Sequence, residues 1–173
     1  PAARPDVRAM RKLTAWLALL PAALQADPAV FVARPMVMMV RKADLGRACS
    51  TAVKVEACTA FAGQVLTCNC ERVGEAWRIE ARAQFIPVMY VTGAERVAHE
   101  KEHIGDVQAA LSGYLARLEA ARFESSAACE ETATVTSARF TRLMDSFKED
   151  SNERFHPRYR RKHPRDVQLM AIR

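Results

Sequence analysis

The stretch that decides the fold is WRIEARA, residues 77–83, in which apolar and polar residues alternate. Alternation with a period of two is typical of a β-strand with one buried and one solvent-exposed face. A turn signal at Gly74-Glu75 precedes it, residues 64–73 before the turn also have strand composition, and residues 85–91 continue extended around a proline. The pattern predicts a β-hairpin with one face open to solvent.

Two shorter segments upstream of the hairpin also have strand composition. They are Val30 to Val32 and Met36 to Val40, and Pro35 separates them. Because proline cannot donate to a strand ladder, we expect an edge or irregular segment here. The methionines at positions 36, 38 and 39 are interpreted as core or partner-facing residues, since no other soft ligand accompanies them to make a copper site.

The hairpin leads directly into a predicted helix that carries the most informative residues of the chain. Thr92 to Glu95 has the pattern of a capping box at the start of this helix. Within the helix, residues 99–103 spell H-E-x-x-H, which places His99 and His103 one turn apart on one face, with Glu100 beside them. An apolar stripe runs through the same helix: Val97, Ile104, Val107, Leu111, Leu115 and Leu118. The motif predicts a zinc-dependent hydrolase.

A second long helix is predicted from Ser126 to about Asn152, capped by Ser125 or Ser126. It must end before Pro157, because the residue before a proline disfavours helical geometry. Its expected inner side consists of five apolar residues: Val135, Phe140, Leu143, Met144 and Phe147. The predicted fold class is α+β, with a small antiparallel sheet packed on two long helices.

Two histidines are too few for a catalytic zinc site, which normally has three protein ligands and an open position for water. The metzincin extension would need glycine and histidine where Asp106 and Ala109 stand, so that class is excluded. Glu130 or Glu131 on the second helix is within reach in principle. The remaining option is His156, because two antiparallel helices of similar length would return it to the neighbourhood of the motif.

The order of these features resembles the zincin metallopeptidases, and more narrowly a family of bacterial secreted proteins described as zinc-dependent proteases of unknown function. The resemblance covers residues 61–156 and is carried by the strand at residues 86–91, the H-E-x-x-H motif, the long second helix and the element Asp150-x-x-x-x-x-His156. Pro157 follows where we expect a glycine. The resemblance implies a zincin-like fold with His156 as the third zinc ligand.

The chemistry of the predicted site follows from the ion and its neighbours. Zinc lowers the pKa of bound water to about 7, and Glu100 serves first as base and then as acid. Arg158 and Tyr159 are candidate donors to the oxyanion. Asp106 and Glu95 are candidate partners for the second nitrogens of the histidines. The resemblance further implies that residues 82–91 serve as an edge strand that aligns the peptide substrate.

The two ends of the chain are predicted to lie outside the functional unit. Residues 1–9 are interpreted as upstream sequence from a misassigned start, and residues 10–26 have the charged and apolar regions of a secretory signal peptide. Its apolar run is shorter than the 20 or so residues of a membrane span, so no stable membrane insertion is expected. Residues 27–156 are assigned to a single zincin-like metallopeptidase domain and residues 157–173 to a basic tail.

The net charge of +6 belongs to these ends. Residues 1–26 have four basic groups against one acidic group, residues 157–173 have six against one, and residues 27–156 are left with −2. A nucleic-acid partner is therefore not expected. Five cysteines fit an exported protein with two disulfides and one free thiol. A Cys129 nucleophile and a role for His163 are both disfavoured.

Taken together, the sequence predicts a secreted or periplasmic zinc metallopeptidase that acts on a peptide or protein substrate. Its ligands would be His99, His103 and His156, its cofactor Zn²⁺ and its catalytic base Glu100. The alternative is a non-catalytic cell-envelope or metal-binding module that retains a vestigial H-E-x-x-H helix.

Overall fold

The predicted hairpin is the longest feature of the sheet. In the computed structural model, which describes residues 29–49, 55–156 and 158–159, strands β3 (Ala57–Val73) and β4 (Ala76–Val91) pair antiparallel over nearly their whole length. The turn at Gly74-Glu75 is confirmed, and Gly74 has a φ of 64°, a left-handed conformation that costs glycine little because it has no Cβ. The predicted signal peptide and most of the basic tail lie outside the described residues.

A β-bulge divides β3 into two halves. The pairing steps from Ala62 opposite Ile86 to Val65 opposite Gln84, so β3 contains one extra residue, and Gly63 within the bulge has a φ of 56°. The extra residue reverses which positions of β3 face the helices. Thr59 does so before the bulge and Cys70 after it, and each is paired with a buried residue of β4.

The sheet is mixed, which corrects the expectation of an antiparallel one. Strands β1 (Val30–Val32) and β2 (Met36–Met39) both run parallel to β4, on the side opposite to β3. The strand pattern fixes which residues alternate but not the direction in which a strand pairs. Here the chain leaves β2, passes through α1 (Lys42–Ala48) and returns along β3, so β2 and β4 point the same way.

The interruption between β1 and β2 lies beside Pro87. Ala33 donates to the carbonyl of Phe85 and Val40 to that of Val91, so odd-numbered residues of β4 direct their backbone groups toward this edge. Pro87 has no N–H to offer there, and the register of β1 ends at Phe85 while that of β2 begins at Val88. Pro87 is thereby tolerated in a central strand.

Strand β4 is interior, so the expectation that residues 82–91 form a substrate-aligning edge is wrong. Residues 83–85 and 88–91 are paired with β1 and β2 on one side, and all of them except Phe85, which lies opposite the bulge, are paired with β3 on the other. Among the described residues, β3 and the β1–β2 pair each have a free edge.

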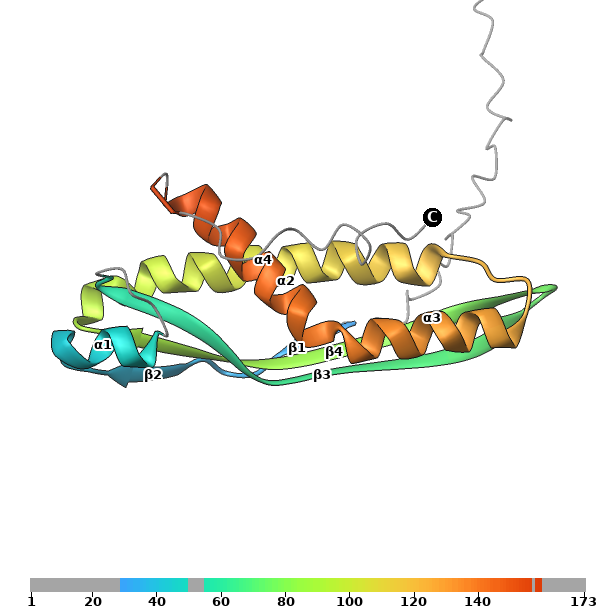
Figure 1. Cartoon of the computed structure of the whole chain (residues 1–173), viewed down its shortest axis with the longest axis horizontal. Helices are drawn as coiled ribbons and strands as arrows, with labels where there is room; N and C mark the ends of the chain where they lie inside the picture. Colours follow the sequence, from blue (N-terminus) through green and yellow to red (C-terminus); the bar gives the residue numbers. More distant parts are fainter. Residues whose placement is uncertain (1–28, 50–54, 157, 160–173) are drawn as a thin grey trace, which may run out of the picture.

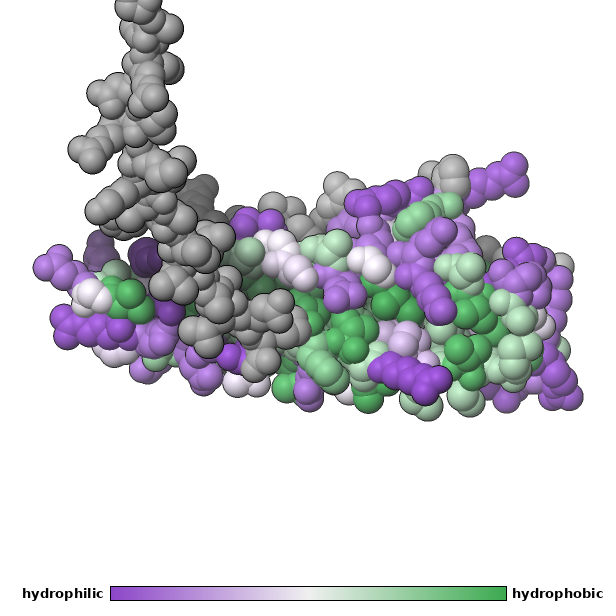
Figure 2. Space-filling view, turned by 180° about the vertical axis from the view of Figure 1, so that it is seen from behind, coloured by the Kyte–Doolittle hydropathy of each residue, from purple (hydrophilic) through white to green (hydrophobic). Residues whose placement is uncertain are grey.

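The methionine cluster of β2 is exposed, so of the two interpretations, core or partner-facing, the core one is wrong. All four residues of the strand are exposed, and Phe31 on β1 is exposed as well. Seen from behind, hydrophobic side chains gather along the lower middle and right of the molecule (Figure 2). Periodicity could not reveal this, because an edge strand of apolar residues has the same composition as a buried one.

Helix α2 (Val97–Ala120) runs along the sheet from the open end of the hairpin toward the turn (Figure 1). Its predicted apolar stripe is confirmed from Ile104 to Leu118, where every stripe residue is buried. Val97, the first residue of the predicted stripe, is only partly buried. The predicted capping box is wrong. The hydroxyl of Thr92 donates to the carbonyl of Glu56 at 3.0 Å, and a short 3₁₀ turn, η1 (Ala94–Arg96), precedes the helix. None of the described helices is long and apolar enough to cross a membrane.

The predicted second helix is two helices, α3 (Ser126–Ala138) and α4 (Phe140–Phe155), which meet at Arg139. Ser125 caps α3 by accepting from the backbone N–H of Ala128, as predicted. Residues 134–137 are threonine, valine, threonine and serine, which are weak helix formers and favour a break here. Helix α3 follows the hairpin, whereas α4 turns away and crosses α2 (Figure 1). Val135 is exposed, while the other four predicted inner residues are buried.

Two disulfides and one free thiol are confirmed. Cys70–Cys129 ties β3 to α3, Cys49–Cys58 ties the end of α1 to the start of β3, and Cys68 is free. The main apolar core lies between the hairpin and α2, α3 and α4. It includes these fully buried side chains: Ile79, Phe85, Leu111, Tyr114, Leu115, Leu118, Leu143 and Met144.

Candidate metal centre

His99 and His103 lie in the first two turns of α2, at the open end of the hairpin. Their four-residue spacing puts both side chains on one face of the helix, with ring centroids 4.8 Å apart. His103 is buried, with 5% of its surface exposed, and His99 is half-buried. The H-E-x-x-H motif is thus helical, and both imidazoles face α4.

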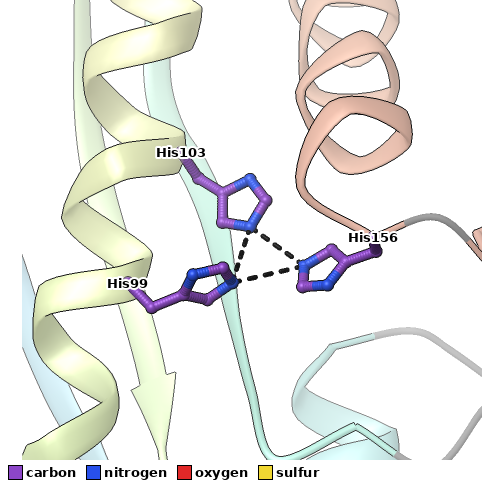
Figure 3. A group of neighbouring side chains, drawn as sticks. All are labelled: His99, His103 and His156. Carbon is purple, nitrogen blue, oxygen red and sulfur yellow. Dashed lines mark hydrogen bonds between the residues drawn. The ribbon is translucent and has the colours of Figure 1, made fainter.

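His156 comes to the same place from the end of α4. It follows the last helical residue, and its backbone N–H still donates to the carbonyl of Asn152 at 2.9 Å. The predicted return of this residue to the start of the first helix is confirmed, because its ring points at the two histidines of α2 (Figure 3). Three residues separated by up to 57 positions converge on one point.

The three Nε2 atoms form a nearly equilateral triangle. The separations are 3.2 Å between His99 and His103, 3.1 Å between His103 and His156, and 3.4 Å between His99 and His156. Two nitrogens bound to tetrahedral zinc at about 2.0–2.1 Å lie about 3.3 Å apart. The triangle therefore has the dimensions of a three-histidine metal site with a fourth position open.

Three converging imidazole nitrogens cannot satisfy one another by hydrogen bonding, because a neutral ring has one N–H and one lone pair. A cation at the centre of the triangle would accept all three lone pairs. These histidines are the one group of three or more potential ligands in the described part of the chain. They could hold a metal ion.

The electrostatics favour the neutral form of two of the three histidines, His103 and His156. Burial lowers the pKa of His103 to about 4, helped by the nearby positive charges of His156 and His99. Burial and His99 also lower the pKa of His156. Metal binding needs the deprotonated imidazole, so these two rings are in the binding form at neutral pH.

The second nitrogens have partners other than those predicted. His103 Nδ1 lies 2.8 Å from the hydroxyl of Ser151, which is fully buried on α4, and His99 Nδ1 lies 3.6 Å from the carboxylate of Glu102. Such contacts orient a ligand ring toward its metal. The candidates Asp106 and Glu95 have other partners, because Asp106 pairs with Arg154 and Glu95 lies beside Arg96.

Phe155 forms an apolar wall beside the triangle. Its ring packs edge-on against His99 at 5.9 Å and His103 at 4.9 Å between centroids. Ser151 and Phe155 are four residues apart on α4, directly before His156, so they share the face that meets α2. Sequence reasoning missed both, because neither lies three or four positions before His156.

Glu100 is turned toward the sheet. Only 3% of its surface is exposed, and its Oε2 accepts a hydrogen bond from the hydroxyl of Thr59 on β3 at 2.7 Å. Burial raises the pKa of Glu100, while the Thr59 hydrogen bond and the positive charges of His99 and Lys148 oppose the rise. A carboxylate with a raised pKa is suited to accept a proton near neutral pH. No local pattern pointed to Thr59.

The remaining sequence candidates lie elsewhere or stay untested. Glu130 and Glu131 are exposed on α3, next to Cys129, which forms the disulfide to β3. They do not belong to the histidine group. The N–H of Tyr159 donates to the carbonyl of His156 at 2.8 Å, which fixes the backbone after the third histidine. Arg158 is exposed, and the role of both residues as oxyanion donors stays a prediction. His163 lies outside the described residues.

Fold and site together define an α+β protein with a helix-borne histidine pair, completed by a third histidine, that could hold a metal ion. No protein-family model, no curated protein and no solved structure matches the chain. The assignment of a function therefore depends on the site itself.

Proposed function

We propose that the protein is a zinc-dependent metallopeptidase with a zincin-like centre, in which His99, His103 and His156 hold the ion. The observation that carries the proposal is the Nε2 triangle of 3.1–3.4 Å, with one coordination position left open. Imidazole nitrogens suit zinc and other transition metals, whereas calcium and magnesium prefer oxygen ligands. Three protein ligands plus an open position is the arrangement of a catalytic zinc site.

The chain's own residues supply the acid–base chemistry in this proposal. Zinc, when bound, supplies Lewis acidity that lowers the pKa of a bound water to about 7. Thr59 donates to Oε2 of Glu100, and in this proposal Oε1 accepts a proton from the attacking water. Glu100 then returns that proton to the leaving amine when the peptide C–N bond breaks. Ser151 holds the ring of His103 in position throughout.

The substrate strand in this proposal is β3 rather than β4. Thr59 lies on the half of β3 before the bulge, beside Glu100, and this half is paired with β4 on one side only. A peptide added to that free edge would run past the carboxylate that Thr59 orients. The proposal therefore places the scissile bond near residues 57–61.

One observation favours a second candidate, a metal-binding module without catalysis. Glu100 is almost fully buried and already hydrogen-bonded to Thr59. A buried carboxylate of this kind can act as a purely structural tie between α2 and β3. In that case the three histidines would bind an ion and no peptide would be cleaved.

The compartment is inferred from the cysteines. Two disulfides indicate an oxidising environment such as the extracellular space or a bacterial periplasm. We propose export by the signal peptide predicted at residues 10–26. Zinc is redox-inactive, so such a site would function in this environment without reductant.

The decisive experiment combines metal analysis with a peptidase assay. Purified protein is analysed for metal by mass spectrometry and incubated with casein and with a mixed peptide library. Glu131→Gln is the matched control, since it removes an exposed carboxylate that was an alternative ligand. We expect one zinc per chain in wild type, Glu100→Gln and Glu131→Gln, and strongly reduced zinc in His156→Ala.

Activity separates the two candidates. If the protein is a metallopeptidase, wild type and Glu131→Gln should cleave peptides, and Glu100→Gln should lose about 10²–10⁴-fold of the peptidase activity. Stoichiometric zinc without cleavage of any peptide would favour the binding module. Protein that neither contains zinc nor takes it up on titration would rule out both.

A further inference from the structure

The edge formed by β2 has an unusual surface for the end of a sheet. Met36, Val37, Met38 and Met39 are exposed by 51, 46, 43 and 62%, and none of them is charged. On one side β2 is hydrogen-bonded to β4, and on the other it has no strand partner among the described residues. Proteins usually protect such an edge with charges or proline inside the strand, because it can pair with another chain.

The backbone of β2 is oriented to accept a further strand. Val40 donates its N–H to the carbonyl of Val91 on β4, and backbone groups alternate in direction along a strand. The N–H groups of Val37 and Met39 therefore face the free edge. The register places Met36 and Met38 with Val88 and Tyr90 on the outer face of the sheet, so apolar side chains flank this edge on both faces.

Charge selects among the possible occupants. Exposed Arg34 precedes the strand, and exposed Arg41 and Lys42 follow it, although Arg41 already pairs with Asp44. In a symmetric antiparallel pair of two copies, with Met36 opposite Met39, Arg34 would stand opposite Arg41, and like charges directly opposed are destabilising. A lipid surface would leave the free backbone groups unpaired. An extended peptide with acidic flanks satisfies both the backbone and the charges.

We propose that the free edge of β2 binds an extended segment of another protein, apolar in its middle and acidic at its ends, by strand addition. This surface is separate from the metal centre. Strand β4 lies between β2 and β3, and it is β3 that carries Thr59 beside Glu100. The edge is therefore a docking site, and it exists whether or not the metal centre is catalytic.

The test is a binding titration with the full chain. The probe is a fluorescein-labelled peptide, Glu-Asp-Val-Thr-Val-Thr-Val-Asp-Glu, and its control has Lys-Lys at both ends in place of the acidic pairs. We expect the acidic peptide to bind at least about tenfold more tightly at low salt, with a preference that shrinks as salt is added. Arg34→Glu combined with Lys42→Glu should reverse the preference.

A matched pair of variants tests the backbone. Val37→Thr keeps the outward N–H and should bind the acidic peptide as wild type does, whereas Val37→Pro removes that donor and should weaken binding at least about tenfold. Far-UV circular dichroism and thermal melts report whether each variant is folded. If Val37→Pro fails to fold, the charge-reversed variant still decides the outcome.

Four results would overturn the proposal. They are equal binding of the acidic and basic peptides, no binding of either peptide, dimerisation of the free chain that Val37→Pro abolishes, and binding to vesicles of phosphatidylglycerol and phosphatidylcholine without binding of the acidic peptide. The third would identify the edge as a self-association surface and the fourth as a membrane contact.

Discussion

The two ends of the β3–β4 hairpin bury different kinds of residue. At the turn end the covered face of β4 meets α2 and α3 through apolar side chains such as Ile79, Leu115 and Leu118, and Cys129 adds a covalent link. At the open end α2 and α4 bury His103, Glu100 and Ser151 beside a much smaller apolar cluster.

Burying polar groups costs free energy unless each is hydrogen-bonded, and here each of the three has a partner on another element. The turn end therefore contributes most of the apolar burial, whereas the open end buries polar groups around three histidines that could hold a metal ion. The following experiments separate these two contributions, beginning with the largest expected effect.

Removing the disulfide at the turn end should have the largest effect on stability. Cys70→Ala with Cys129→Ala opens a cross-link between residues 59 positions apart, which is worth about 4 kcal/mol of unfolding free energy in a chain-entropy model. Urea denaturation measures the change. The matched control is Cys49→Ala with Cys58→Ala, which spans 9 positions and should cost about 3 kcal/mol.

The loss of stability in Cys70→Ala with Cys129→Ala is to be compared with the metal affinity of the same variant in its folded state. We expect it to stay close to that of wild type for Cys70→Ala with Cys129→Ala, because the bond lies far along α3 from the histidines. A large loss of zinc affinity in this variant would show that the two ends are not separable.

Leu118→Ala should destabilise the turn end by about 3 kcal/mol, the usual cost of a cavity at a fully buried leucine. The same denaturation experiment measures it, with Val135→Ala at an exposed position of α3 as the control. An effect of Leu118→Ala no larger than that of the control would contradict the assignment of the main core to this end.

Thr59→Val tests the open end by removing the donor to Glu100. The buried carboxylate would lose its hydrogen bond, at a cost of about 2 kcal/mol in unfolding free energy. The pKa of Glu100 should rise further, because that hydrogen bond favours its charged form. In an active enzyme the acidic limb of the pH–rate profile should therefore move to higher pH, and an unmoved limb would argue against Glu100 as the base.

Ser151→Ala should weaken metal binding by about tenfold, the lower end of the range for partners that orient a ligand. Competition with a zinc-binding dye measures the affinity. Ser126→Ala, on α3 away from the site, is the control. Unchanged affinity in Ser151→Ala would mean that packing against Phe155 alone holds the ring of His103.

Acidification should give the smallest effect, and only in metal-free protein. The pKa of His103 is lowered to about 4 in the fold from an ordinary value of 6.5, so the unfolded chain binds more protons between these pH values. Stability is therefore full above about pH 6.5 and is lost as the pH falls toward 4, by about 1 kcal/mol between pH 7 and 5.5.

The variant His103→Gln removes the titration of His103. Glu100, whose raised pKa changes stability with pH in the opposite direction, is present in both proteins, so its contribution cancels in the comparison. Thermal melts in EDTA should fall more steeply for wild type than for His103→Gln as the pH is lowered. Parallel curves would show that His103 is not held neutral by the fold.

Local patterns predicted the parts of the fold that depend on local geometry. The alternation of residues 77–83 and the stripe from Ile104 to Leu118 correspond to β4 and α2, because periods of two and 3.6 residues directly reflect which face is buried. His156 was identified by its place at the end of a returning helix, and its ring is indeed beside those of His99 and His103.

Long-range choices were beyond the same reasoning. Thr92 has the spelling of a helix cap, but its hydroxyl donates to Glu56, which is 36 positions away. The partners of the site, Thr59 and Ser151, lie 41 and 48 positions from the groups they contact. The parallel pairing of β2 likewise depends on where the chain goes after the strand ends. Such contacts are decided by the assembled fold, and a short window of sequence does not contain them.

The extra residue in β3 determines which side chains face the helices on each side of the bulge. Thr59 and Cys70 differ by an odd number of positions, yet both face the helices, because the bulge at Gly63 adds one step between them. If the same residues formed a regular strand without the bulge, one of the two side chains would lie on the wrong face. Such a strand could keep the disulfide or the support for Glu100, but it could not keep both. Deleting one residue at the bulge would leave ten positions between Thr59 and Cys70, so a regular strand would again place both on the helix face.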